Sequence, residues 1–205
     1  NYPGQTEFVA ERLGAKNFAM MLMAGDFRVA LVTTHLPLRK VTEAITSKKI
    51  VEQLRVVEHE LQSRFGIAQP RIAVTGLNPH AGENGVLGEE ERTIIAPAIA
   101  HAQREGLHAE GPFSADALFG QFAQGRNENN ATPFDAYLAM YHDQGLIPLK
   151  MYGFGRAVNY TAGLPVLRIS PDHGTAYNIA GKNLAQPSSM IEALKLAVAL
   201  LTKER

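Results

Sequence analysis

No cysteine occurs in the 205-residue chain. A disulfide framework is therefore excluded, and the absence is compatible with a cytoplasmic enzyme. It also removes thiolates from the available metal ligands. Any transition-metal site must be built from nitrogen and oxygen atoms.

The chain also lacks an excess of charge and long hydrophobic runs. Its 20 Lys and Arg residues balance its 20 Asp and Glu residues, so no broad attraction to nucleic acid or anionic membranes is expected. The longest apolar runs, residues 18–24 and 196–201, are far shorter than the roughly 20 residues of a membrane span. We expect neither nucleic acid nor a membrane as a partner.

What is present alternates between helical and strand-like segments. Apolar residues from Ile50 to Phe65 recur at helical spacing, and Gly25-Asp26 between two apolar runs indicates a hairpin turn. This alternation predicts an α/β layered sheet. The expected helices are residues 6–13, 47–65, 89–106, 114–124 and 188–204, and the expected strands are residues 18–24, 28–34, 71–75, 134–141, 157–160 and 166–169.

Three further expectations concern details of these elements. Pro97 is expected to kink the helix at 89–106, and the Asn-rich residues 126–132 are expected to form a solvated loop. The closing helix is expected to bury one apolar face. That face consists of Ile191, Leu194, Ala197, Val198 and Leu201.

Three of the seven histidines follow predicted strands and adjoin turn residues or a carboxylate, namely His35, His80 and His142. A single histidine is more often a surface or structural residue than a ligand. Imidazole is nevertheless the commonest metal ligand in proteins, and three of them would form an open site with room for substrate or water. Asp143 could orient a ligating ring, and Asp116 could serve as a further ligand.

A second group combines cations with an amide: Lys150, Asn159 and Arg168. Such side chains could hold a phosphate or a carboxylate, although lysines and arginines are usually solvated. Arg168 lies within an apolar strand-like segment, where a buried guanidinium needs a partner. Further on, residues 172–176 (DHGTA) form a glycine-containing turn, and no Gly-x-Gly-x-x-Gly motif occurs to support a Rossmann cofactor site.

Taken together, these segments resemble the 4-hydroxythreonine-4-phosphate dehydrogenase family of pyridoxal phosphate biosynthesis. The matching strings extend over nearly the whole chain. They are residues 3–8 (PGQTEF), 28–38 (RVALVTTHLPL), 76–83 (GLNPHAGE), 111–116 (GPFSAD), 139–145 (AMYHDQG), 157–159 (AVN), 163–165 (GLP) and 172–176 (DHGTA). Residues 172–182 also look like the cofactor loop of the isocitrate and isopropylmalate dehydrogenases. The resemblance therefore implies a three-layer α/β/α fold of that type, not a Rossmann fold.

The resemblance also implies an activity. The enzyme would oxidise 4-phosphooxy-L-threonine with NAD and decarboxylate the product to 3-amino-2-oxopropyl phosphate. His35, His80 and His142 would bind one divalent metal (zinc, magnesium, manganese or cobalt), with His142 supplied by the other subunit of a homodimer. The phosphorylated substrate would contact Thr6, Lys150, Asn159 and Arg168, and NAD would contact Asp172, His173 and Gly174.

The chain departs from the family pattern in two respects. Gln5 stands where the family has a histidine, and glutamine cannot carry a proton or a charge. Family members are also longer at the amino terminus, so we expect residues 1–205 to be the metal-, substrate- and NAD-binding portion of a two-domain dehydrogenase, with most of the first domain absent. The catalytic base is not assigned.

Three alternatives remain open at this point. Gln5 is compatible with a paralogous dehydrogenase of another phosphorylated hydroxy acid, such as a four-carbon aldonate phosphate. The chain could also be a non-catalytic metal- and phosphate-binding dimerisation module. A zinc hydrolase would use the three histidines but would leave residues 172–182 unexplained.

Overall fold

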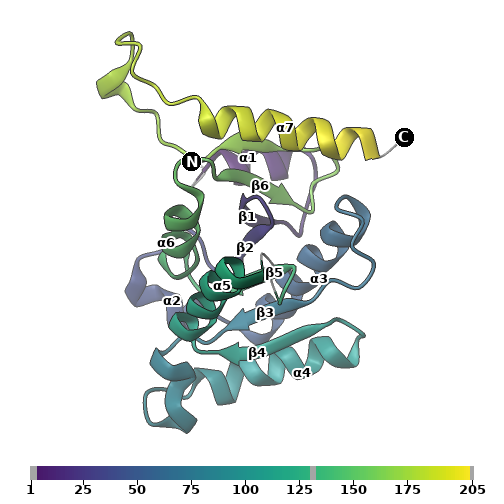
Figure 1. Cartoon of the computed structure of the whole chain (residues 1–205). Helices are drawn as coiled ribbons and strands as arrows, with labels where there is room; N and C mark the ends of the chain where they lie inside the picture. The colour runs from purple at the N-terminus through teal and green to yellow at the C-terminus, as the bar shows by residue number, and fades with distance from the viewer. Residues whose placement is uncertain (1–3, 130–132, 204–205) are drawn as a thin grey trace.

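A seven-stranded mixed β-sheet forms the middle layer of the molecule, with helices against both faces (Figure 1). This computed structural model describes residues 4–129 and 133–203. The strands are β1 (Ala19–Ala24), β2 (Phe27–Leu31), β3 (Ile72–Thr75), β4 (Ala109–Phe113), β5 (Ala136–Ala139), β6 (Val158–Ala162) and β7 (Ile169–Pro171). The α-helices are α1 (Gln5–Arg12), α2 (Val41–Ala44), α3 (Ser47–Ser63), α4 (Ala96–Arg104), α5 (Ala115–Asn129), α6 (His142–Gly153) and α7 (Ser188–Lys203).

The strand directions are mixed, in the order β4-β3-β5-β2-β1-β6-β7. Strands β2, β3, β4 and β5 are parallel, whereas β1 is antiparallel to β2 and β6, and β7 is antiparallel to β6. The expected hairpin at Gly25-Asp26 is confirmed by the pairing of Ala24 with Phe27. Because the four parallel strands end at one edge, that edge is where ligands gather in open α/β sheets.

Each face of the sheet has its own hydrophobic core. Helices α3, α4 and α7 cover one face, and α5 and α6 cover the other. Along β1, Met21 and Met23 face the first core, whereas Leu22 faces the second, as the two-residue period of a strand requires. The ring of Phe27 stacks on that of Phe122 in the second core, with centroids 4.0 Å apart. The expected three-layer α/β/α fold without a Rossmann sheet is thus confirmed.

The helix expected over residues 47–65 is confirmed as α3, but the helix expected over 89–106 is interrupted. It begins as a π-helical turn, Glu91–Ile95, and continues as α4. Pro97 lies in the first turn of α4, directly after the π-helical turn, so its missing N–H and its ring affect the turn that precedes it. The departure from a regular α-helix thus lies in the turn before Pro97.

Two boundaries differ from the expectation. A loop was expected at residues 126–132. This prediction is wrong for residues 126–129, which belong to α5, and residues 130–132 lie outside the described residues. Arg126 and Glu128 are helix formers that can extend an existing helix. The strand expected over 166–169 forms later, as β7, because its ladder with β6 pairs Ile169 with Tyr160.

The buried face of α7 differs from the expected one. Ala193 and Leu200 are buried and Leu196 packs against the same core, whereas Ile191, Leu194, Val198 and Leu201 are exposed. The hydrogen bonds of Ser189 explain which face of α7 is buried. Ser189 accepts a hydrogen bond from the Asp172 amide (2.8 Å) and donates one to the Ala157 carbonyl (2.6 Å), which anchors the other side of α7 to the sheet.

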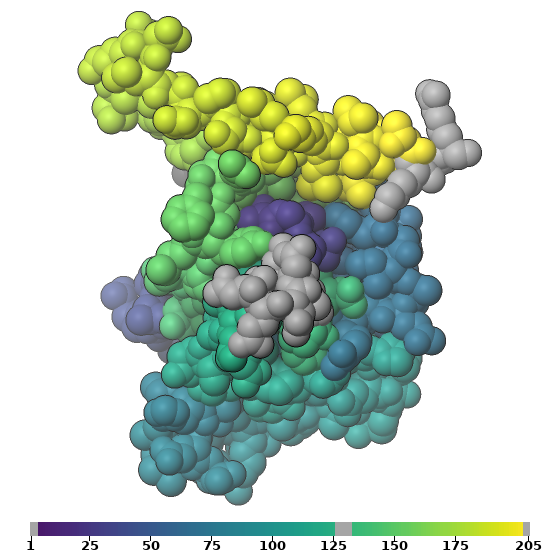
Figure 2. Space-filling model, in the orientation of Figure 1, coloured from purple at the N-terminus to yellow at the C-terminus, as the bar shows by residue number. Residues whose placement is uncertain are grey.

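Figure 2 shows the segment that precedes α7 projecting from the body of the molecule, while α7 itself lies along the body. The expectation that α7 extends to residue 204 reaches beyond the described residues, which end at 203. Among the described helices, none combines the length and apolarity needed to cross a bilayer.

Candidate active site

His35 and His142 lie side by side at the edge where the parallel strands end. Hydrogen bonds continue past β2, from Val32 N to Ala139 O (2.9 Å) and from Thr33 N to Met140 O (3.2 Å). The Thr33 hydroxyl also donates to Met140 O at 2.7 Å. This pairing carries the two chain segments in parallel, and the imidazole centroids of His35 and His142 are 5.7 Å apart.

Gln144 fixes the start of α6, where His142 lies. Its Oε1 accepts hydrogen bonds from the Thr75 hydroxyl (2.8 Å) and the Met140 amide (2.7 Å), and its Nε2 donates to Gly76 O (2.7 Å). One side chain thus joins the ends of β3 and β5 to the first turn of α6. This residue was not predicted from the sequence, although it stands two positions after His142 in a matching string.

A carboxylate accompanies His142, as expected. The Nδ1 atom of His142 lies 2.7 Å from Asp143 Oδ1. A ring oriented in this way through Nδ1 has Nε2 available as a metal ligand. This neighbour is what a ligating imidazole usually requires.

His80 belongs to a separate loop whose backbone is held by Glu91. Oε1 of Glu91 accepts hydrogen bonds from the amides of Leu77 and Asn78, both at 2.7 Å. Burial would raise the pKa of Glu91, but the hydrogen bonds from Asn78 and Leu77 outweigh it and the pKa is lowered. At Gly82, with φ of 78°, a Cβ would lie 2.6 Å from Oε2 of Glu91, so the loop fits closely around this carboxylate.

The charge of His80 acts on Asp116, which was considered as a further ligand. The pKa of Asp116 is lowered, first by the hydrogen bond from Ser114 and to a smaller extent by His80. Within residues 4–129 and 133–203, no three histidine or carboxylate side chains converge closely enough to hold a metal ion. One chain therefore brings His35 and His142 together and leaves His80 outside this pair.

The proposed substrate residues Thr6 and Arg168 are in direct contact. Nη1 of Arg168 donates to the hydroxyls of Thr6 (3.1 Å) and Thr161 (2.8 Å). Burial lowers the pKa of Arg168, and the charge of Glu7 opposes this shift. Asn159 lies two residues before Thr161 on β6 and so faces the same side of the sheet. Its Oδ1 is buried without a hydrogen-bond partner among the described residues.

Lys150, on α6, pairs with a residue that was expected to contact the cofactor. Its Nζ lies 3.1 Å from Asp172 Oδ1. His173 and Gly174 follow Asp172 and are exposed. The structure thus joins the predicted substrate and cofactor segments at one ion pair.

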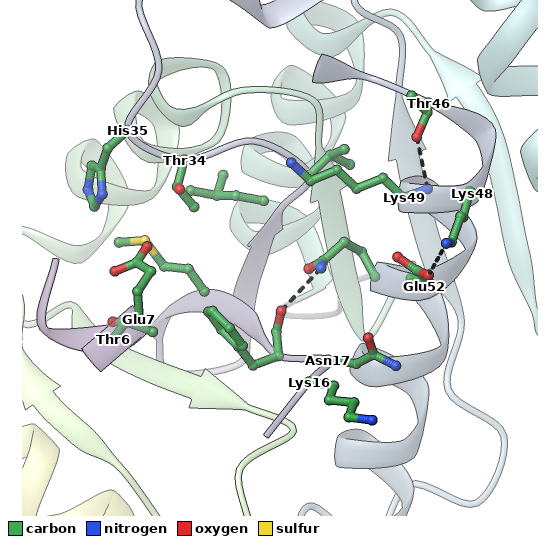
Figure 3. A pocket seen from close by; sticks show the side chains of 15 residues that line it. Thr6, Glu7, Lys16, Asn17, Thr34, His35, Thr46, Lys48, Lys49 and Glu52 are labelled. Carbon is green, nitrogen blue, oxygen red and sulfur yellow. Dashed lines mark hydrogen bonds and ion pairs between the residues drawn. The ribbon is translucent and has the colours of Figure 1, made fainter. Parts of the chain in front are cut away.

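A cavity of about 440 Å³ connects several of these residues (Figure 3). Thr6 and Glu7 of α1 and Thr34 and His35 after β2 line one part of it, and α3 lines the other. His35 also lines a second cavity, of about 280 Å³, together with His142 and Asp143. His35 therefore stands between the space beside Thr6 and the space beside His142.

Comparison with known proteins identifies relatives over almost the whole chain. A family profile described as pyridoxal phosphate biosynthetic protein PdxA matches residues 1–197. A 4-hydroxythreonine-4-phosphate dehydrogenase of Sulfurihydrogenibium sp. (strain YO3AOP1) is 50% identical over 199 residues, which are 97% of this chain and 59% of that protein.

Solved structures of similar proteins include a member of the same family. A 4-hydroxythreonine-4-phosphate dehydrogenase from Klebsiella pneumoniae is 42% identical with a TM-score of 0.82, and the match covers 97% of this chain and 57% of that one. A terephthalate 1,2-cis-dihydrodiol dehydrogenase from Burkholderia xenovorans LB400 is 30% identical with a TM-score of 0.74, covering 96% of this chain and 60% of that one. The chain thus spans less than two thirds of the length of these relatives.

Proposed function

Because the chain belongs to the PdxA family of pyridoxal phosphate biosynthetic proteins, we propose that it forms the metal-, substrate- and NAD-binding part of a 4-hydroxythreonine-4-phosphate dehydrogenase. The reaction is the NAD-dependent oxidation of the secondary alcohol of 4-phosphooxy-L-threonine, with decarboxylation to 3-amino-2-oxopropyl phosphate. The observation that carries this proposal is the placement of His35 beside both His142 and the cavity lined by Thr6.

We propose that His35, His80 and His142 hold one divalent metal ion. The 5.7 Å separation of the His35 and His142 rings and the carboxylate at His142 Nδ1 support this assignment. Three imidazole ligands suit zinc better than magnesium or manganese, which prefer oxygen ligands. Cobalt is a further candidate metal. A divalent ion bound there would lower the pKa of the substrate hydroxyl and stabilise the alkoxide.

The metal site is proposed to be shared between the subunits of a homodimer, because His80 lies outside the pair within one chain. The resemblance assigns His142 to the partner subunit, whereas the closeness of His35 and His142 in one chain favours His80 as the residue that crosses. Mixed dimers of single-alanine variants distinguish the two arrangements. A mixture retains an intact site only when the two mutated histidines belong to different subunits of that site.

Zinc binding restored in a mixture of His35→Ala and His142→Ala chains would assign His142 to the partner subunit. Binding restored with His35→Ala and His80→Ala would instead assign His80. Mixtures that never regain zinc binding would contradict a shared site.

We propose that Arg168, Lys150, Thr6 and Asn159 bind the phosphorylated substrate. The two cations neutralise the phosphate, the Thr6 hydroxyl donates to it, and the buried Oδ1 of Asn159 can accept from a substrate hydroxyl. Asp172, His173 and Gly174 are proposed to contact NAD. The ion pair between Lys150 and Asp172 supports this, because the segment proposed to contact NAD then lies next to the lysine proposed to bind the phosphate. Such contacts orient the reacting carbon toward the nicotinamide.

NADH formation tests the proposal. With zinc and NAD present, we expect the full-length dehydrogenase to produce NADH from 4-phosphooxy-L-threonine and Arg168→Met to suppress turnover strongly. A four-carbon aldonate phosphate is the control substrate, because Gln5 and the 30% identity to a dehydrogenase of another substrate favour a paralogous activity as the second candidate. Turnover of the aldonate phosphate alone would establish that alternative. Metal and NAD binding without any turnover, persisting in the full-length protein, would instead indicate a binding module.

A further inference from the structure

Four polar side chains of α3 line the larger cavity: Lys48, Lys49, Glu52 and Gln53. Lys49 and Gln53 are four residues apart, so they lie one above the other on the helix surface. Both line the cavity that also contains Thr6 and His35. In Figure 3, the Lys49 side chain extends from α3 across the cavity in the direction of Thr34. Neither Lys49 nor Gln53 was assigned a role from the sequence.

The ammonium group of Lys49 has no hydrogen-bond or ion-pair partner in the described part of the chain. Burial lowers the pKa of Lys49, and the charge of Glu52 opposes this only in part. Glu52 itself lies 3.8 Å from the neighbouring Lys48, whose side chain is 85% exposed. A partly desolvated cation without a partner is unfavourable, so this position is suited to an anionic group of a ligand.

Gln53 offers a hydrogen-bond acceptor to the same cavity. Its Nε2 donates to Phe18 O at 3.1 Å, and this bond fixes which end of the amide is the acceptor. The Oε1 atom is buried and has no hydrogen-bond partner among the described residues. A buried acceptor left unpaired costs free energy, and a ligand ammonium group would supply the missing donor.

We propose that Lys49 and Gln53 bind the amino-acid end of the phosphorylated substrate, Lys49 the carboxylate and Gln53 the ammonium group. This inference rests on the proposed function. Arg168 and Lys150 are the cations proposed to bind the phosphate. Arg168 directly precedes β7, Lys150 lies on α6, and neither lines this cavity. The cavity leads from Thr6, which contacts Arg168, to the two side chains on α3. A substrate with phosphate at one end and an amino-acid group at the other matches this arrangement.

Ligands that differ by one group test the assignment of Lys49. Calorimetric titrations in the presence of zinc would compare 4-phosphooxy-L-threonine with 3-amino-2-hydroxypropyl phosphate, which lacks only the carboxylate. We expect Lys49→Met to weaken binding of the first ligand by about 10- to 100-fold, as for a lost charged hydrogen bond, and to leave the second nearly unchanged. Lys195→Met, on α7 and outside this cavity, is the matched control and should affect neither ligand, whereas Lys49→Arg should retain most of the affinity.

The corresponding test for Gln53 uses 3-hydroxy-4-phosphooxybutanoate, which lacks only the amino group. We expect Gln53→Leu to weaken binding of 4-phosphooxy-L-threonine by about 5- to 20-fold, in the range of one buried hydrogen bond, with little effect on the deaminated ligand. Thermal unfolding of each variant checks that the fold is retained.

Equal losses for both members of a ligand pair would overturn the inference, since the residue would then not recognise the group removed. A fully folded Lys49→Met chain with unchanged affinity for 4-phosphooxy-L-threonine would do the same. If wild-type protein binds none of the phosphorylated ligands, the proposed function itself fails. The two failures are therefore distinguishable.

Discussion

Two side chains position the histidine loops through hydrogen bonds to the backbone around them. Gln144 joins three backbone segments around His142, and Glu91 collects the amides that precede His80. Each satisfies buried backbone groups that have no strand or helix partner at these positions. The placement of the candidate ligands thus depends on amide and carboxylate groups close to them in space.

Replacing Gln144 by leucine should both destabilise the protein and weaken metal binding. The change leaves Thr75, Met140 and Gly76 without their partner. At about 1 kcal/mol for each hydrogen bond, we expect a loss of about 2–4 kcal/mol in the free energy of unfolding in urea, together with weaker zinc binding. Gln121→Leu, at an exposed position on α5, is the control. Equal stability of the two variants would contradict the role assigned to Gln144.

The lowered pKa of Glu91 makes the stability of the protein depend on pH. The pKa of Glu91 in the folded protein lies below its ordinary value of 4.5, so the unfolded chain binds the proton more readily. The stabilisation is therefore present above the ordinary pKa and is lost as the pH falls through the folded-state pKa. Urea titrations should show wild type exceeding Glu91→Gln in stability near neutral pH, with the difference shrinking below about pH 4.5. A difference that grows on acidification would have the wrong sign.

At the scale of elements, the sequence patterns predicted those whose packing partners are local. The apolar spacing of α3 and the Gly25-Asp26 turn each specify one structure. The face of α7 could not be predicted, because apolar residues occupy more than one side of that helix. The choice depends on Ser189, whose partners at Ala157 and Asp172 are distant in sequence.

Helix α6 must approach the sheet closely to bring His142 to its place. A Cβ at Gly145 would lie 2.6 Å from Val29 Cγ1 and 3.0 Å from Ala139 Cβ. We expect Gly145→Ala to destabilise the protein by about 1–3 kcal/mol through overpacking. Gly120→Ala in α5 is the matched control, because no atom lies within 4 Å of its added Cβ. It should stabilise the helix by about 0.5–1 kcal/mol.

Denaturant unfolding of the two alanine variants measures both effects in one experiment. The change in the free energy of unfolding should have opposite signs for the variants in α6 and α5. Stabilisation by Gly145→Ala would show that α6 is free to move away from β2, and the position of His142 would then not be determined by packing.

At the scale of the whole molecule, the site combines parts of the chain that are far apart in sequence. The order of strands places β2 next to β5, and so His35 next to His142. Placement after strands singled out these histidines in the sequence as candidates, and the structure brings their rings side by side. The contact of Arg168 with Thr6 and the roles of Lys49 and Gln53 could not be predicted, because they depend on how α1, α3 and β7 pack around one cavity.

The central claim is that His35, His80 and His142 form one metal site, and zinc titration tests it most directly. Calorimetry on wild type should give one zinc ion per chain, and alanine at any of the three positions should weaken binding at least about tenfold, since even partners of metal ligands contribute that much. His101→Ala is the control, because His101 lies on α4 and contacts Glu105. Unchanged zinc affinity in folded His80→Ala would contradict the claim.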